Sequence, residues 1–121
     1  EWCFYGWREG RAHVFLGPNN VPDVWQVKKV NPQSMVHLTE KPVELAVRAM
    51  QYSSRPGERV LDIFGGSGST LIAAEQTERK ALLMELDPLY CDVIVKRWEE
   101  FTGRTAERVI ADVPAEIGSG V

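Results

Sequence analysis

The sequence lacks several features that would define a membrane or secreted protein. It holds no uninterrupted apolar run of the ~18 residues that a membrane-spanning helix requires. Its first residues, EWCFYGWREG, do not have the basic-then-apolar layout of a signal peptide. An initiator methionine is also absent, so we expect the chain to begin inside a longer protein. These absences favour a cytoplasmic protein without a membrane segment.

Cysteine and histidine are scarce, with two residues of each type. Cys3 and Cys91 lie far apart in the chain, and without a secretion signal we expect two free thiols in a reducing compartment. Neither these cysteines nor His13 and His37 have neighbours at the spacing of metal ligands. No metal site is therefore expected.

The sequence also lacks the excess of basic charge that is typical of nucleic-acid-binding domains, because its net charge is −3. The charge is unevenly distributed, however. Residues 1–31 carry four basic side chains against three acidic ones, and they hold six of the eleven aromatic residues. If the protein contacts a polyanion, we expect the contact to involve the basic side chains of this segment: Arg8, Arg11, Lys28 and Lys29.

The chain does contain helical and strand patterns, within a length of 121 residues that suits one domain. Residues 12–16 and 24–30 are rich in β-branched and aromatic residues and are separated by the turn formers GPNNVPD. This pattern predicts a β-hairpin or two short strands. A loop is expected at residues 31–38.

From Pro42 onward, apolar residues recur at helical spacing until the sequence SSRPGE ends the helix. The apolar runs at 59–64 and 80–85 are short and nearly continuous, as in parallel strands buried on both faces. Further helices are predicted over 70–77 and 87–103, and a third strand over 107–112. This order is that of a βαβ unit in an α/β fold with a mainly parallel sheet.

The glycine-rich turn Gly65–Gly68 is the most informative feature. Glycines after a buried strand permit positive φ angles and let a ligand approach the N–H groups of the next helix. A phosphate-binding P-loop requires a lysine after the glycines, and none is present. A dinucleotide fingerprint fits in part, because Gly66 and Gly68 match its first two glycines but Leu71 stands at the third. A nucleoside–methionine cofactor, S-adenosylmethionine, is the third ligand class that suits such a turn.

Glu85 lies at the end of the second predicted strand, 20 positions after Gly65. In dinucleotide-binding folds an acidic residue about 20 positions beyond the glycines binds the ribose hydroxyls. We therefore expect Glu85 to bind ribose. The alternative is a plain tight turn with a surface glutamate and no ligand.

Three segments occur in a fixed order: HLTEKPVEL (37–45), VLDIFGGSGSTLIAAE (60–75) and LMELDPLYCDVIVKRWEEFTG (83–103). Together they resemble the C-terminal part of the β-class DNA amino-methyltransferases, which modify adenine N6 or cytosine N4 in DNA. Residues 1–36 resemble the tail of the phage or prophage branch. The resemblance implies a bacterial or phage-encoded enzyme of the restriction-modification type. It also implies a partial Rossmann-like S-adenosylmethionine methyltransferase fold with an N-terminal β-hairpin-like segment.

The resemblance divides the chain into three parts. Residues 1–36 would be the tail of the target-recognition region, residues 37–112 the cofactor-binding part, and residues 113–121 a flexible tail. Its H-x-T-x-K-P motif, over the methionine end of the cofactor, matches His37, Thr39, Lys41 and Pro42. Its cofactor loop matches Asp62, Phe64, Gly65, Gly66, Ser67 and Gly68. Glu85 matches the ribose-binding acid, and Leu86 would flank the adenine.

Two of these roles have a direct physical basis. Lys41 can neutralise the methionine carboxylate, and Phe64 can form an apolar wall. The alternatives are that Lys41 is a surface lysine of the first helical turn and that His37 only forms loop hydrogen bonds.

The catalytic tetrapeptide of the family, D/N/S-P-P-Y/F/W, is absent. In these enzymes it holds the flipped target base and precedes the H-x-T-x-K-P motif. Only 36 residues precede His37 here, and they contain no Pro-Pro. We therefore expect an isolated chain without catalytic residues, either a fragment of a longer enzyme or a chain that has lost catalysis. The similar segment Asp87–Tyr90 is interpreted as a helix start, with aspartate at the N-cap and proline at the first helical position.

The expected cofactor is S-adenosylmethionine, and the expected partners are double-stranded DNA and the missing N-terminal half. In the family's sheet, the strand with the tetrapeptide pairs beside residues 60–64. Without it an apolar edge is exposed, which predicts self-association as the alternative. Two other functions stay open: a non-catalytic S-adenosylmethionine-binding module that completes another chain, and a dinucleotide-binding oxidoreductase fragment.

Overall fold

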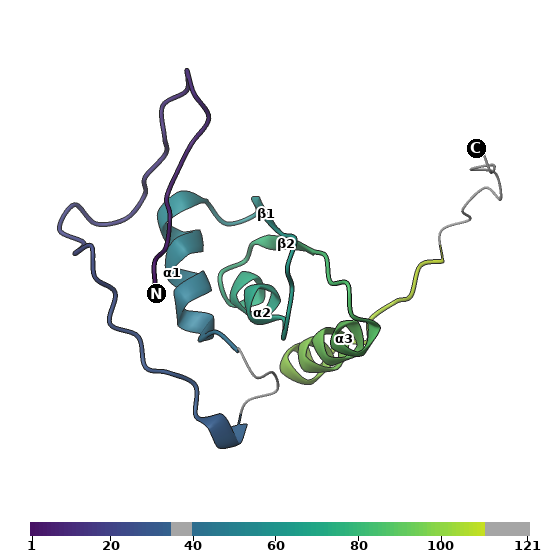
Figure 1. Ribbon diagram of the computed structural model, residues 1–121. Helices are drawn as coiled ribbons and strands as arrows, with labels where there is room; N and C mark the ends of the chain where they lie inside the picture. The colour runs from purple at the N-terminus through teal and green to yellow at the C-terminus, as the bar shows by residue number, and fades with distance from the viewer. Residues whose placement is uncertain (35–39, 111–121) are drawn as a thin grey trace, which may run out of the picture.

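The computed structural model describes residues 1–34 and 40–110 (Figure 1). Within them, a short 3-10 helix is followed by alternating α-helices and strands. The bounds are η1 Pro32–Ser34, α1 Val43–Ser53, β1 Arg59–Asp62, α2 Ser69–Gln76, β2 Lys80–Leu83 and α3 Pro88–Thr102. The predicted order of helix, strand, helix, strand and helix is therefore confirmed. None of the helices in these residues is both long and apolar enough to cross a membrane.

The two strands form a parallel pair, with Val60 beside Ala81 and Leu61 beside Leu82. Parallel strands cannot be joined by a tight turn, so the chain crosses over through α2 between the end of β1 and the start of β2 (Figure 1). The result is the βαβ unit and the α/β fold that the sequence predicts.

The core lies between α1, α2 and one face of the sheet. Met50 of α1 is buried together with Ala73 and Ala74 of α2. Val60 and Ala81 pack against this group from the two strands. The helical spacing of the apolar residues in α1 thus places one stripe of the helix against the sheet and α2.

The opposite face of the sheet is exposed, although both strands were predicted to be buried on both faces. Successive side chains of a strand point to opposite faces, so Leu61 and Leu82 point away from the core and are 66% and 54% exposed. Ile63 and Met84, two residues further along, are 51% and 62% exposed. In the described part of the chain no helix covers these four side chains, which we call the open face.

The β-hairpin predicted within residues 12–30 is wrong, because residues 1–31 form no strand. The apolar residues of this segment contact α1 instead. The N–H of Leu16 donates to the carbonyl of Tyr52 at 2.7 Å. The rings of Phe15 and Trp25 lie 5.5 and 5.8 Å from the Tyr52 ring. β-branched and aromatic residues also occur where rings contact a helix, so their pattern does not by itself require strand pairing. Here Phe15 contacts Tyr52 and is still 44% exposed.

The chain turns at residues 19–20, inside the predicted turn segment 17–23, and it also reverses closer to its N-terminus. The N–H of Arg11 donates to the carbonyl of Arg8 at 3.2 Å and closes a turn there. The rings of Trp7 and His13, on the two sides of this turn, lie 4.5 Å apart. Ring contacts therefore hold the two sides together without a ladder of backbone hydrogen bonds.

Two other predictions in the flanking segments need correction. The loop expected at 31–38 begins with η1, where Asn31 Oδ1 accepts a hydrogen bond from the Gln33 N–H at 3.1 Å. The third strand expected at 107–112 does not form over residues 107–110, and Val109 and Ile110 are 83% and 80% exposed. An apolar run becomes a strand only beside a partner strand, and these residues have none in the part of the chain described. The end of that run and the tail expected at 113–121 lie outside the described residues.

Helix α3 begins where MELDPLYCDVI predicts a helix start. Asp87 is the N-cap residue, and its Oδ1 accepts a hydrogen bond from the Leu89 N–H at 2.9 Å. Pro88 is the first helical residue. The helix ends at Gly103, whose φ of 69° lies in the left-handed region that favours glycine. The interpretation of Asp87–Tyr90 as a helix start is confirmed.

Candidate functional site

The glycine turn 65–68 lies at the carboxyl end of β1, which is where open α/β sheets bind ligands. Gly66 and Gly68 have φ angles of 54° and 82°, a region that favours glycine. A Cβ added to Gly66 would meet only the Phe64 carbonyl, at 3.9 Å. This part of the turn therefore faces open space and can be approached by a ligand.

Gly65 and Gly68 are needed for packing inside the protein. A Cβ on Gly65 would lie 3.1 Å from Ile94 Cδ1 of α3 and 3.2 Å from the carbonyl oxygen of Met84. A Cβ on Gly68 would lie 3.3 Å from two carbon atoms of the Ile94 side chain. Gly65 and Gly68 thus allow α3 to pack closely against the turn, whereas Gly66 leaves the solvent side of the turn open.

A cavity of about 220 Å³ opens beside the turn. Six of the cofactor residues implied by the family resemblance line it: Lys41, Asp62, Phe64, Gly65, Gly66 and Ser67. Ser69 and Thr70 complete the lining and were not among the predicted site residues. The sequence could have indicated these two residues, because both carry a hydroxyl group and both lie in the first turn of the helix that follows the glycines. The cavity is smaller than the roughly 300–1,000 Å³ of a typical ligand pocket, so it would enclose only part of a cofactor.

Glu85 contacts the glycine turn directly. Because β1 and β2 are parallel, their carboxyl ends are adjacent, and Glu85 Oε2 accepts a hydrogen bond from the Gly66 N–H at 2.7 Å. Its Oε1 accepts from the Asp87 N–H at 3.0 Å. The carboxylate therefore lies between the turn and the start of α3. The structure thus places Glu85 beside the glycine turn, and its binding of ribose stays a prediction.

Asp62 braces the same turn from the end of β1. Its Oδ1 accepts from the Phe64 N–H at 2.9 Å, and its Oδ2 accepts from the Thr70 hydroxyl at 2.6 Å. Oδ1 thus holds the loop directly after β1, and Oδ2 joins the strand end to the first turn of α2. In this structure Asp62 shapes the turn.

Lys41 and Pro42 lie at the start of α1, and Pro42 occupies the N-cap position. The ammonium group of Lys41 pairs with the carboxylate of Glu1. This hydrogen bond and the charge of Lys41 lower the pKa of the Glu1 carboxyl below its usual value. Lys41 also lines the cavity, and in this structure its ammonium group is engaged by Glu1. The other two residues of the predicted motif, His37 and Thr39, lie outside the described residues.

The expected apolar wall is open to solvent. Phe64 lines the cavity but is 83% exposed, and Leu86 is 97% exposed. Both residues follow the carboxyl ends of the strands and therefore lie near the turn, but their side chains are too exposed to form a closed apolar wall. A ligand would cover apolar surface that now contacts water.

A larger hollow of about 440 Å³ lies away from the glycine turn, between α2, the start of β2 and α3. A hydrogen bond and an ion pair cross it: Trp98 Nε1 donates to Glu75 Oε1 at 2.8 Å, and Arg104 pairs with Glu75 Oε2 at 2.6 Å. The residues that line this hollow include no glycine and no first residue of a helix. Its size alone does not make it the better site.

Two residues that the sequence reasoning did not select, Glu40 and Arg97, join the site to α3. Their side chains form an ion pair of 2.9 Å next to Ser67. Glu40 lies inside the H-x-T-x-K-P segment, so its position in the sequence could have indicated a place near the site. Arg97 has no local signal, because it lies in the middle of an ordinary helical pattern.

The four basic residues proposed for DNA contact are all exposed. Arg8 and Arg11 flank the turn near the N-terminus, and Lys28 and Lys29 follow Trp25 in the sequence. The segment that carries them runs past α1, on the side away from α3 (Figure 1).

The thiols and acidic groups show no metal site. Cys3 and Cys91 are free thiols, as predicted. Within residues 1–34 and 40–110, no three histidine, cysteine, aspartate or glutamate side chains are grouped so that they could hold a metal ion.

Comparison with known proteins shows the family to which the chain belongs. The sequence profile of the N6_N4_Mtase family, described as DNA methylase, matches residues 13–96. Since this is more than half of the chain, the protein belongs to this DNA methylase family. The resemblance to DNA amino-methyltransferases is thus confirmed, while the phage-like branch stays a prediction.

Two curated relatives show how much of the sequence is shared. The chain is 34% identical over 98 residues to the type II methyltransferase M.Cfr9I of Citrobacter freundii, covering 80% of this chain and 32% of that protein. It is 34% identical over 80 residues to the type II methyltransferase M2.DpnII of Streptococcus pneumoniae, covering 64% and 30%. The chain therefore spans about a third of the length of the curated relatives that it matches.

Two solved structures share the fold. The M1.HpyAVI–SAM complex superposes with a TM-score of 0.61 at 27% identity, covering 70% of this chain and 43% of that one. TTHA0409 of Thermus thermophilus, a candidate DNA modification methylase complexed with S-adenosyl-L-methionine, gives a TM-score of 0.51 at 43% identity. That match covers 55% of this chain and 28% of the other.

Proposed function

We propose that this chain is the S-adenosylmethionine-binding portion of a DNA methyltransferase that modifies adenine N6 or cytosine N4. The main support is the contact between Glu85 and the Gly66 N–H at 2.7 Å, which joins an acid and a glycine turn at the ends of two parallel strands. Membership of the DNA methylase family supports the reaction class. The two similar solved structures are complexes with this cofactor.

The residues present fit the cofactor in their chemistry. S-adenosylmethionine, when bound, supplies an electrophilic methyl group. The carboxylate of Glu85 accepts hydrogen bonds from ribose hydroxyls, and the ammonium of Lys41 neutralises a carboxylate at the amino-acid end. Phe64 and Leu86 give apolar surface to the adenine and the thioether. Gly66 gives the ligand close access to the backbone, since nothing but the Phe64 carbonyl is near its open side.

We assign these roles to residues 37–112, which would form the cofactor-binding part. His37 and Thr39 would complete the site around Lys41 and Pro42. Asp62 would act indirectly, because it holds Phe64 and Thr70 in place.

Calorimetry of the 121-residue chain with S-adenosylhomocysteine and with NAD tests this function. We expect S-adenosylhomocysteine to bind and NAD not to bind. Binding of NAD alone would support a dinucleotide-binding oxidoreductase and overturn the proposal.

The chain supplies no base clamp of its own, since no D/N/S-P-P-Y/F/W tetrapeptide occurs in the sequence. The residues that hold the flipped base would come from the rest of the enzyme or from another chain. We therefore expect no methyl transfer to unmethylated DNA by residues 1–121 alone. Measurable transfer of a labelled methyl group by the pure chain would refute this part of the proposal.

Residues 1–36 would belong to the target-recognition region and contact DNA. The support is the exposure of Arg8, Arg11, Lys28 and Lys29, which lets them meet phosphates. Replacing all four by alanine in the full enzyme should weaken DNA binding and reduce its dependence on salt. Unchanged DNA affinity would remove this role.

A further inference from the structure

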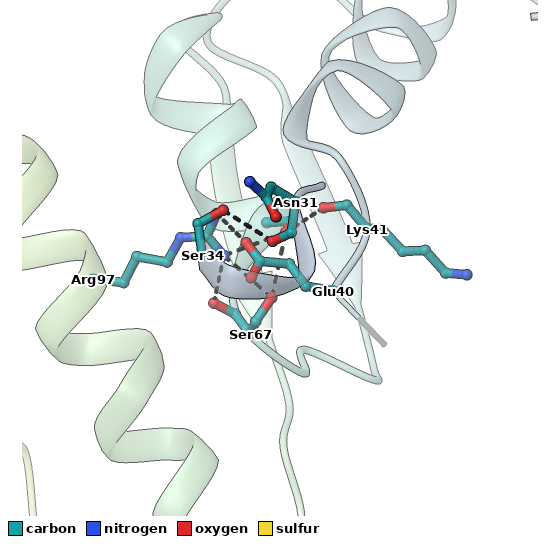
Figure 2. Close-up of polar contacts among 7 residues, drawn as sticks. Asn31, Ser34, Glu40, Lys41, Ser67 and Arg97 are labelled. Atoms are coloured by element: carbon teal, nitrogen blue, oxygen red, sulfur yellow. Dashed lines mark hydrogen bonds and ion pairs between the residues drawn. The ribbon is translucent and has the colours of Figure 1, made fainter. Parts of the chain in front are cut away.

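Arg97 of α3 connects two parts of the site that are far apart in the sequence (Figure 2). Its Nη1 donates to the carbonyl of Ser67 at 3.0 Å and to the Ser67 hydroxyl oxygen at 3.1 Å. Its Nη2 pairs with Glu40 Oε1 at 2.9 Å. One guanidinium group thus contacts both the glycine turn and the segment just before α1.

Ser69 extends this cluster to Lys41. Its hydroxyl donates to the carbonyl of Lys41 at 2.9 Å and lies 3.4 Å from Arg97 Nη1. Figure 2 shows the side chain of Lys41 pointing away from Arg97, so the two cations are kept apart. We call Glu40, Ser67, Ser69 and Arg97 the Arg97 cluster.

The Arg97 cluster is shielded from water. The side chain of Glu40 is 6% exposed and that of Arg97 is 21% exposed. By contrast, the neighbouring pair Lys96–Glu100 on the same helix is 77% and 68% exposed. A shielded ion pair with several hydrogen bonds holds one geometry, whereas an exposed pair contributes little.

The position of Arg97 relative to the cavity suggests an indirect role. Lys41, Ser67 and Ser69 line the cavity, whereas Arg97 is not among its lining residues. Arg97 therefore contacts groups that line the cavity from behind. Its planar fork of donors can bridge two acceptors at once, which a lysine ammonium does less rigidly.

We propose that Arg97 is a positioning residue that sets the distance between Lys41 and the glycine turn, so that both fit the amino-acid end of S-adenosylmethionine. This inference rests on the proposed function. Without Arg97, Glu40 and Ser67 lose their shared donor, and the segment before α1 is held less firmly to the turn, although the hydrogen bond from Ser69 to the Lys41 carbonyl remains. The adenosine end contacts Glu85 instead, and Glu85 is outside the Arg97 cluster.

Two ligands that differ only at the amino-acid end test the inference. S-adenosylhomocysteine carries this end, and 5′-methylthioadenosine lacks it. We expect Arg97→Met to weaken S-adenosylhomocysteine binding roughly tenfold, by analogy with the loss when a group that orients a metal ligand is removed. Binding of 5′-methylthioadenosine should change by less than about twofold. Arg97→Lys should show a smaller loss with the same selectivity, because it keeps the charge but not the fork.

The measurements are calorimetric titrations at a temperature where circular dichroism shows each variant to be folded. Lys96→Met on the same helix is the matched control and should bind both ligands as the wild type does. Equal weakening of the two ligands would show a general effect on the fold and overturn the inference, as would an unchanged S-adenosylhomocysteine affinity. If Arg97→Met does not fold, the same comparison with Arg97→Lys decides. Failure of the wild-type chain to bind S-adenosylhomocysteine would instead contradict the proposed function.

Discussion

At the scale of single residues, the site depends on two carboxylates with different tasks. Glu85 accepts from the Gly66 and Asp87 N–H groups and so lies between the turn and the start of α3. Asp62 uses one oxygen for the Phe64 N–H and the other for the Thr70 hydroxyl. One carboxylate is therefore expected to affect ligand binding and the other to affect stability.

Glu85→Gln keeps the shape of the side chain and one carbonyl acceptor but removes the charge. We expect S-adenosylhomocysteine to bind roughly tenfold more weakly or worse, because a hydrogen bond to a charged group contributes about 1.5–3 kcal/mol. Calorimetry measures this change, and Glu100→Gln on the exposed surface of α3 is the control. Equal affinities of Glu85→Gln and the wild type would rule out the ribose-binding role.

Asp62→Asn should lower the stability of the chain. The amide oxygen can still accept from the Phe64 N–H, but the amide NH2 can only donate to the Thr70 hydroxyl, so the charge-assisted hydrogen bond from Thr70 is replaced by a weaker neutral one. We expect the free energy of unfolding to fall by about 1 kcal/mol, which urea titration would measure. An unchanged unfolding midpoint would contradict the bracing role of Asp62.

At the scale of elements, the start of α3 shows that a segment resembling a catalytic motif can have a purely structural role. Asp87 caps the helix through the Leu89 N–H, and Pro88 occupies the first helical position. The hydrogen bond to the backbone already explains why aspartate stands there.

Asp87→Ala removes this cap and should lower the free energy of unfolding by about 1 kcal/mol. Asp92→Ala is the matched control, because Asp92 is exposed in the interior of the same helix. Thermal unfolding followed by circular dichroism would show a lower midpoint only for Asp87→Ala. The same midpoint for both variants would contradict the capping role.

The elements between residues 42 and 103 could be predicted from the sequence because each has a local signal. Helix α1 has apolar residues at helical spacing, and α3 has a proline start and a glycine stop. The two strands are short apolar runs, and the parallel pairing follows from the crossover through α2.

The segments outside this range could not be predicted in the same way. The strand-like pattern of residues 12–30 has no partner strand, and the rings of Phe15 and Trp25 contact the Tyr52 ring of α1, which is distant in sequence. The same limit applies to the site. Glu85 and Gly66 were expected to act together from the spacing of a known fold, whereas the contact between Glu40 and Arg97 exists only after α3 has packed.

At the scale of the whole molecule, the open face is the largest departure from an ordinary α/β domain. Parallel sheets are normally covered on both faces. In the part of the chain described, β1 pairs only with β2, and Leu61, Ile63, Leu82 and Met84 are more than half exposed. Apolar surface of this kind together with an unpaired strand edge favours association.

We therefore expect the 121-residue chain to associate with itself in the absence of a partner. Light scattering at tens of micromolar should give a mass above that of a monomer, and Leu61→Lys should lower it. Leu89→Lys is the control, because Leu89 is 73% exposed but belongs to α3 and not to the open face. A clean monomer for the wild-type chain would contradict this expectation.

The location of the cofactor at the carboxyl ends of β1 and β2 can be measured by NMR on the ¹⁵N-labelled chain during titration with S-adenosylhomocysteine. We predict that the amide signals of Lys41, Gly66 and Ser67 shift most, because these residues line the cavity beside the glycine turn. The signals of Lys80 and Trp98, around the larger hollow, should shift little. Shifts centred on that hollow, or no shifts at saturating ligand, would contradict a cofactor site at the glycine turn.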